Sequence, residues 1–134
     1  MDDQRREVER EAVLDAPAEE VWEALTDERL LGEWLADEAE LEPFPGGRAS
    51  FRFGDGTERE GTVLRVEEER ELAFTWARPG EPETEVELTL VPLVSGTRLV
   101  VVERAGAATP TALAAAAWGA RLTALELALS LVLA

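Results

Sequence analysis

Glu103 is the residue of this chain whose position most favours chemistry. It continues the alternation of Leu99 and Val101, so on a β-strand its carboxylate would turn toward the apolar side of the sheet. A carboxylate buried there needs a partner, and Arg10 or Arg121 could supply one. Such a pair could act as an acid and a base. Alternatively, the strand ends at this point, Glu103 lies in water, and the alternation has no functional meaning.

The residue types that this chain lacks limit the chemistry that it can perform. Among its 134 residues there is no histidine, cysteine or tyrosine, and all 13 basic residues are arginine. Without imidazole, thiolate, amine or phenol groups, the usual metal ligands, nucleophiles, Schiff-base lysines and phenolic acids are missing. The serines have no histidine with which to form a triad. We therefore expect no metal, no cofactor and no catalytic residues.

The chain is strongly acidic, with 29 Asp and Glu residues and a formal net charge of −16. Nucleic acids and anionic membrane surfaces bind basic clusters, so we expect neither as a partner. The acidic runs at 37–42, 67–71 and 81–87 are predicted to form solvated edges and loops. The apolar stretch at 111–134 contains Arg121 and Glu126, which disfavours a membrane span. No secretory signal is visible, which favours a cytoplasmic protein.

The periodicity of the apolar residues predicts the elements that would position these side chains. A first strand over residues 8–14 ends before Pro17, and a short helix follows. Asp27 can cap a second short helix that ends near Trp34. From there on, period-two alternation between turns predicts an antiparallel meander with one apolar and one wet face. No linker or repeat interrupts the chain, so we expect one domain over residues 1–134.

A long helix is predicted for the end of the chain, and it is apolar on two opposite sides. One apolar stripe comprises Ala114, Trp118, Leu122, Leu125, Leu129 and Val132. The other comprises Leu113, Ala116, Ala120, Ala124, Leu127 and Leu131. Both stripes must be buried, and one sheet can cover only one of them. The second stripe therefore predicts a homodimer through this helix, unless loops or short helices of the same chain cover it.

Several segments, in their order along the chain, resemble a known superfamily. They are 15–22 (Asp-Ala-Pro-Ala-Glu-Glu-Val-Trp), 31–34 (Leu-Gly-Glu-Trp), 61–67, 70–76 and 96–99. Together with the Trp-bearing terminal helix, they are similar to the START-like (birch-pollen-allergen-type, SRPBCC) superfamily, in the branch of the C-terminal domain of the heat-shock-protein-90 ATPase activator. The resemblance implies an α+β helix-grip fold. In that fold a curved antiparallel sheet surrounds the long C-terminal helix, and two short helices follow the first strand.

The same resemblance implies a concave face that is either filled by its own side chains or hollowed into an apolar pocket. The residues expected to bind a ligand there are Trp34, Phe51, Phe53, Leu64, Phe74, Trp76, Leu88, Val101, Glu103, Trp118 and Leu122. We expect a non-catalytic domain that binds a small apolar molecule. One alternative is a protein-interaction module that acts on a chaperone or a regulator. Another is a polyketide cyclase- or dehydratase-like enzyme that uses Glu103 with Arg10 or Arg121.

Overall fold

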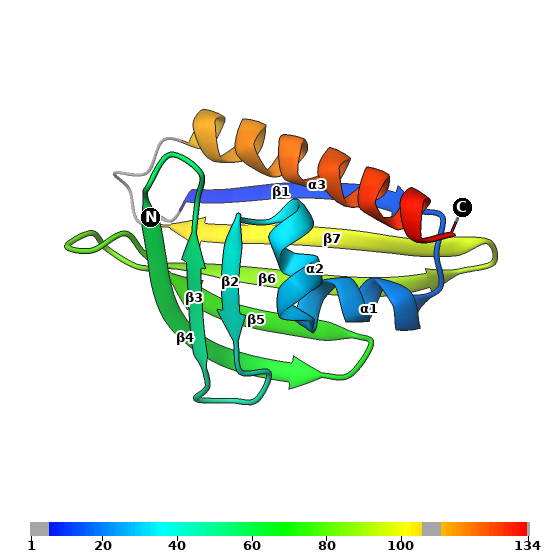
Figure 1. The fold of residues 1–134 in the computed structure, drawn as a ribbon, viewed down its shortest axis with the longest axis horizontal. Helices are drawn as coiled ribbons and strands as arrows, with labels where there is room; N and C mark the ends of the chain where they lie inside the picture. Colours follow the sequence, from blue (N-terminus) through cyan, green and yellow to red (C-terminus); the bar gives the residue numbers. More distant parts are fainter. Residues whose placement is uncertain (1–5, 106–110, 134) are drawn as a thin grey trace, which may run out of the picture.

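The long C-terminal helix packs along the first strand of a curved, seven-stranded antiparallel sheet (Figure 1). The computed structural model describes residues 6–105 and 111–133. In chain order the elements are β1 (Arg6–Leu14), α1 (Ala18–Thr26), α2 (Glu28–Trp34), β2 (Glu38–Leu41), β3 (Arg48–Arg52), β4 (Glu58–Glu67), β5 (Glu71–Trp76), β6 (Thr84–Leu93), β7 (Gly96–Ala105) and α3 (Thr111–Leu133). The strands lie in the order β1-β7-β6-β5-β4-β3-β2. The predicted α+β helix-grip fold is confirmed, since a meander of six strands follows α2 and β1 joins its last strand.

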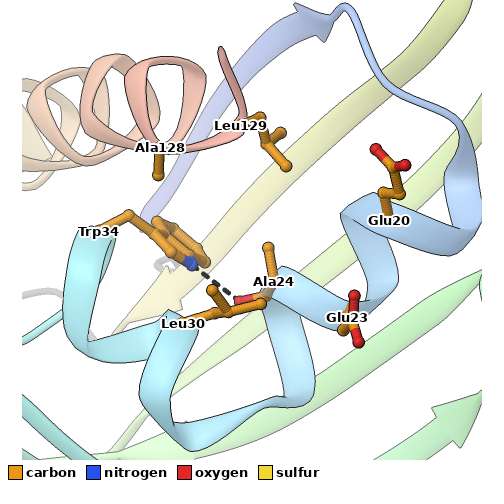
Figure 2. A pocket seen from close by; sticks show the side chains of 7 residues that line it. All are labelled: Glu20, Glu23, Ala24, Leu30, Trp34, Ala128 and Leu129. Atoms are coloured by element: carbon orange, nitrogen blue, oxygen red, sulfur yellow. Dashed lines mark hydrogen bonds between the residues drawn. The ribbon is translucent and has the colours of Figure 1, made fainter. Parts of the chain in front are cut away.

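The two short helices pack against each other, and local sequence signals set their limits. Asp27 lies between α1 and α2, where its Oδ1 accepts hydrogen bonds from the backbone N–H groups of Arg29 (2.8 Å) and Leu30 (3.2 Å). This is the N-cap that its residue type predicts. The Trp34 indole N–H donates to the Ala24 carbonyl oxygen (2.9 Å), which ties the end of α2 to α1 (Figure 2).

A β-bulge in β4 changes which side chains face the core. Val63 pairs with Phe74 of β5, and Arg65 pairs with the preceding residue of β5, Ala73, so Leu64 is an extra residue without a partner. The alternation shifts at this point: Val63 is buried, whereas Leu64 is 36% exposed. The prediction that Leu64 lies on the concave face is wrong, because period-two counting assumes an unbroken ladder.

The C-terminal helix buries one of its two predicted apolar stripes. The buried members are Trp118, Leu122, Leu125 and Leu129. On the opposite side Ala116 and Ala120 are exposed, and Leu127 is 63% exposed. The side chains at 113, 131 and 132 lie outside the part of the chain that the structure describes. Within the described ranges, none of the helices has the length and apolarity of a membrane span.

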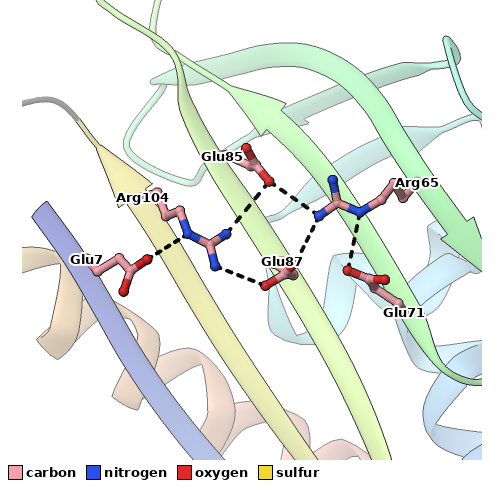
Figure 3. A network of polar contacts seen from close by, with 6 residues as sticks. All are labelled: Glu7, Arg65, Glu71, Glu85, Glu87 and Arg104. Atoms are coloured by element: carbon pink, nitrogen blue, oxygen red, sulfur yellow. Dashed lines mark hydrogen bonds and ion pairs between the residues drawn. The ribbon is translucent and has the colours of Figure 1, made fainter. Parts of the chain in front are cut away.

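The face of the sheet opposite the helices carries a network of ion pairs (Figure 3). Its members are Glu7, Arg65, Glu71, Glu85, Glu87 and Arg104. Burial and a hydrogen bond with Glu87 raise the pKa of Glu71. Burial also opposes ionisation of Glu87, but hydrogen bonding to Glu71 and the charge of Arg104 outweigh it and lower the pKa of Glu87. Residues 84–87 of the acidic run at 81–87 belong to strand β6, where Glu85 and Glu87 form ion pairs on this face of the sheet.

Candidate functional site

The Glu103 carboxylate is buried near the end of β7 and connects this strand to three other elements. Glu103 is only 6% exposed. Its Oε2 accepts hydrogen bonds from the Trp76 indole N–H (2.9 Å) and the Thr84 hydroxyl (2.5 Å), and its Oε1 accepts one from the Trp118 indole N–H (2.7 Å). A carboxylate on β7 thereby connects β5, β6 and α3. Charged acceptors make the stronger hydrogen bonds, so this arrangement fixes both indole rings.

Two expectations for Glu103 are corrected by these contacts. It does not lie in water at a strand end, and its partners are not the predicted arginines. Among the described residues, neither Arg10 nor Arg121 forms an ion pair or hydrogen bond with it; neutral indole and hydroxyl donors satisfy the carboxylate instead. The Arg10 guanidinium lies against α3 at Gly119, where the Cβ of a larger residue would be 2.5 Å from its Nη2 atom.

Four aromatic side chains form the buried floor beside Glu103. They are Phe51, Phe74, Trp76 and Trp118, each at most 2% exposed. The indole rings of Trp76 and Trp118 are stacked, with centroids 5.8 Å apart and planes inclined by 22°. Phe51 meets Trp76 edge-on at 5.4 Å, a favoured aromatic geometry. Phe53, which follows β3, meets the same indole at 6.2 Å and is only half-buried.

Two half-buried arginines cover the outer side of this floor. The Arg59 Cζ lies 4.6 Å from the centroid of Trp76 and 5.5 Å from that of Phe53. The Arg121 Cζ lies 4.9 Å from the centroid of Trp118, 5.3 Å from that of Trp76 and 5.5 Å from that of Phe53. These distances are typical of cation–π contacts. We call the set Phe53, Arg59, Trp76, Glu103, Trp118 and Arg121 the arginine–aromatic cluster.

Strand pairing and helix spacing explain why both arginines reach the floor. Arg59 on β4 pairs directly with Phe51 on β3, and directly paired residues project to the same face of a sheet. Arg121 lies three residues after Trp118 on α3, so it flanks the buried stripe. Sequence reasoning missed Arg59 because the bulge at Leu64 reverses the alternation of β4. Thr84 was missed as well, since a threonine at the start of a strand carries no signal for this role.

The cluster concentrates positive charge in an acidic protein. Burial, and after it the charge of Arg59, lowers the pKa of Arg121 to about 10, although the charge of Glu103 opposes the change. Burial also lowers the pKa of Arg59. Both guanidinium groups nevertheless remain charged at neutral pH. Two positive charges and one negative charge thus share a place from which water is partly excluded, where electrostatic interactions are stronger than at the surface.

The other predicted site residues divide between the core and the far end of the molecule. Leu88, Val101 and Leu122 are buried in the core. Trp34 is not part of the cluster; it lines a hollow of about 90 Å³ between α1, α2 and the end of α3 (Figure 2). A wider hollow of about 380 Å³ borders the turns at 15–18 and 92–96. Among the described residues, no group of three Asp or Glu side chains is arranged to hold a metal ion.

Comparison with known protein families shows which family this chain belongs to. The sequence model of the family described as "Activator of Hsp90 ATPase homolog 1-like protein" matches residues 15–130. The chain belongs to this family. The predicted resemblance is therefore confirmed, and the family matches from the turn after β1 into the last turns of α3. Among curated proteins, none matches this chain.

Solved structures of other proteins share the fold. Protein MLL2253 from Mesorhizobium loti is 28% identical with a TM-score of 0.85, over 93% of this chain and 97% of its own. DynU16, a protein of the dynemicin biosynthetic locus, is 29% identical with a TM-score of 0.84. The match covers 96% of this chain and 48% of DynU16, so this chain spans about half of that protein. The Aha1 dimer from Colwellia psychrerythraea is 19% identical with a TM-score of 0.74, over 90% of this chain and 93% of its own.

Proposed function

We propose that this chain is a small-molecule-binding domain whose ligand binds at the arginine–aromatic cluster. One observation supports this location above the rest of the concave face. The rings of Phe53, Trp76 and Trp118 are covered on their outer side by the side chains of Arg59 and Arg121. Arginine side chains are long and can change rotamer without disturbing the core. A flat apolar molecule that displaced them would gain a ready aromatic surface.

The role of Glu103 in this proposal is to position the two indole rings. Both of its oxygens already accept hydrogen bonds, from Trp76 and Thr84 on one side and Trp118 on the other. The stacked rings are therefore held in place before a ligand arrives, which reduces the ordering cost of binding. A cyclase- or dehydratase-like reaction would need an acid or base that is free to exchange protons with a substrate. The contacts of Glu103 do not favour that alternative.

The hollow beside Trp34 is a weaker candidate for the ligand site. Its volume of about 90 Å³ is small, whereas ligand pockets in proteins typically measure about 300 to 1,000 Å³. Its rim also carries Glu20 and Glu23, which would disfavour apolar or anionic molecules. The apolar part of that hollow is better explained as imperfect packing between α2 and α3.

A dye titration tests the proposed function. Phenylnaphthylamine is a neutral aromatic dye whose fluorescence rises in apolar surroundings. We expect saturable binding to the unchanged protein and about tenfold weaker binding to Phe53→Ala, because a ring contact is worth about 1.5 kcal/mol or more. Phe44→Ala is the matched control, since Phe44 lies in the turn before β3 and is 54% exposed. Absence of saturable binding, or equal losses in the two variants, would contradict the proposal.

We further propose that the exposed apolar stripe of α3 binds a second copy of this chain. Support comes from Ala116, Ala120 and Leu127, which are exposed on one side of the helix. Small residues there allow another helix to approach closely. The Colwellia psychrerythraea Aha1 protein is a dimer in its solution structure, and at 19% identity the likeness extends to the fold alone. Action on a chaperone and a cytoplasmic location stay predictions.

A further inference from the structure

We propose that Arg59 and Arg121 form an anion-binding subsite, and that the ligand of the arginine–aromatic cluster is a flat apolar molecule bearing one anionic oxygen-acid group. This inference rests on the proposed function and adds the chemical class of the ligand. The carboxylate, sulfonate or phosphate group of the ligand would lie between the two guanidinium groups. Its ring system would pack on Phe53 and the indole rings beneath.

The absence of carboxylate partners for these two arginines is the first supporting observation. On the opposite face of the sheet, Arg65 and Arg104 each contact three glutamates. Within the described residues, Arg59 and Arg121 form neither ion pairs nor side-chain hydrogen bonds, although the chain has more than twice as many acidic as basic residues. Buried charges in proteins are normally paired, and both of these side chains are partly buried. An external anion would supply the missing partner.

The placement of the two guanidinium groups is the second observation. They come from different elements, β4 and α3, yet both lie over the indole of Trp76 and both lie 5.5 Å from the ring of Phe53. Each guanidinium has five N–H donors in a planar fork that suits oxygen acids. Burial, and after it the charge of Arg59, lowers the pKa of Arg121, and a bound anion between the two guanidinium groups would offset their repulsion.

Glu103 does not already fill the role of that anion. Its oxygens are occupied by the indole and hydroxyl donors, and it attracts the two arginines only through space. The side chains of the cluster itself thus carry two positive charges and one negative charge; outside it, Glu81 and Asp55 attract Arg59 through space and Arg78 repels it. At physiological salt, charges farther away than about 8 Å are largely screened, so most of the overall charge of −16 acts only weakly on the two guanidinium groups.

The test compares two dyes that differ in one anionic group. Anilinonaphthalene sulfonate has the ring system of phenylnaphthylamine and adds a sulfonate. We expect the unchanged protein to bind the sulfonate dye about tenfold more tightly than the neutral dye, although the protein and the sulfonate dye are both negatively charged. In Arg59→Gln and in Arg121→Gln, this preference should fall to about twofold or less. Arg70→Gln, in the exposed turn between β4 and β5, removes the same charge elsewhere and should keep the preference.

The outcomes distinguish a failure of the anion-binding subsite from a failure of the proposed binding function. If the neutral dye binds in a Phe53-dependent way but the sulfonate dye binds no better, the subsite is wrong and the binding function stands. If neither dye binds, both fail. If Arg121→Gln does not fold, Arg59→Gln and Arg121→Lys carry the test, because lysine keeps the charge and should keep part of the preference. A preference unchanged in Arg59→Gln would overturn the proposal.

Discussion

Replacing Glu103 with glutamine tests whether the carboxylate holds the cluster together. The carboxylate accepts from three donors on two oxygens, whereas a glutamine amide has one oxygen and an NH₂ group that cannot accept. In either amide orientation at least one indole N–H, of Trp76 or of Trp118, faces another donor. A buried donor without a partner costs about 1 to 3 kcal/mol, and the remaining hydrogen bonds lose their charge assistance. Glu103→Gln should therefore destabilise the protein by about 2 to 4 kcal/mol.

Denaturant unfolding followed by circular dichroism measures this loss. Glu9→Gln on β1 is the control, because Glu9 is exposed and the change removes the same charge. Trp118→Phe removes one of the competing donors, so the double change should be less destabilising than the two single changes added together, by about 1 kcal/mol. The same cycle with Trp76→Phe covers the other amide orientation. A loss below about 0.5 kcal/mol for Glu103→Gln would refute the reasoning, since that is the range of ordinary surface changes.

Other predictions concern the backbone, the ion-pair network and assembly. Gly61→Ala should destabilise the protein by more than about 2 kcal/mol, because the new Cβ would overlap a backbone oxygen of β5. The new Cβ of Gly119→Ala would meet only the movable end of an arginine side chain, so this change should be neutral or stabilising by up to about 1 kcal/mol. Denaturant unfolding curves measure both changes. Glu71→Gln should raise the melting temperature at pH 7, because the raised pKa of Glu71 means that folding favours its protonated form, which glutamine resembles. This advantage should vanish below pH 4.5, the ordinary pKa of a glutamate, because the native Glu71 is then protonated too. The lowered pKa of Glu87 has the opposite sign: its contribution is present above 4.5 and is lost as the pH falls through its lowered value, so Glu87→Gln should destabilise at pH 7. Leu127→Glu should shift sedimentation from dimer to monomer, and a protein that is monomeric before the change would contradict the dimer.

Local sequence signals predicted the parts of the fold that depend on neighbouring residues. Asp27 could be identified as a helix cap because capping depends on the residue type and on backbone groups two and three residues away. The alternation of Glu103 with Leu99 and Val101 indicated burial, but the sequence left open whether the strand ends there and exposes the carboxylate. Its partners could not be predicted, because hydrogen bonds from Trp76 and Trp118 depend on how β5 and α3 meet β7 in space.

The β-bulge in β4, which the sequence did not predict, explains why part of the site was missed. The bulge at Leu64 adds a residue to β4, so the alternation on its two sides is out of phase. Counting through the bulge places Leu64 inside and Arg59 outside, and the structure has both reversed. A bulge depends on the pairing of two strands, and nothing in the composition of β4 marks it. The arginine–aromatic cluster was hidden for this reason.

The most direct test of ligand binding at the cluster uses the side-chain N–H signals of the four tryptophans in a proton–nitrogen correlation spectrum. Trp76 and Trp118 lie in the cluster and donate to Glu103, whereas Trp34 donates to Ala24 at the far hollow and Trp22 lies on α1. On titration with phenylnaphthylamine, the signals of Trp76 and Trp118 should move and those of Trp22 and Trp34 should not. Movement of the Trp34 signal alone, or of none of the four at saturating dye, would contradict the account.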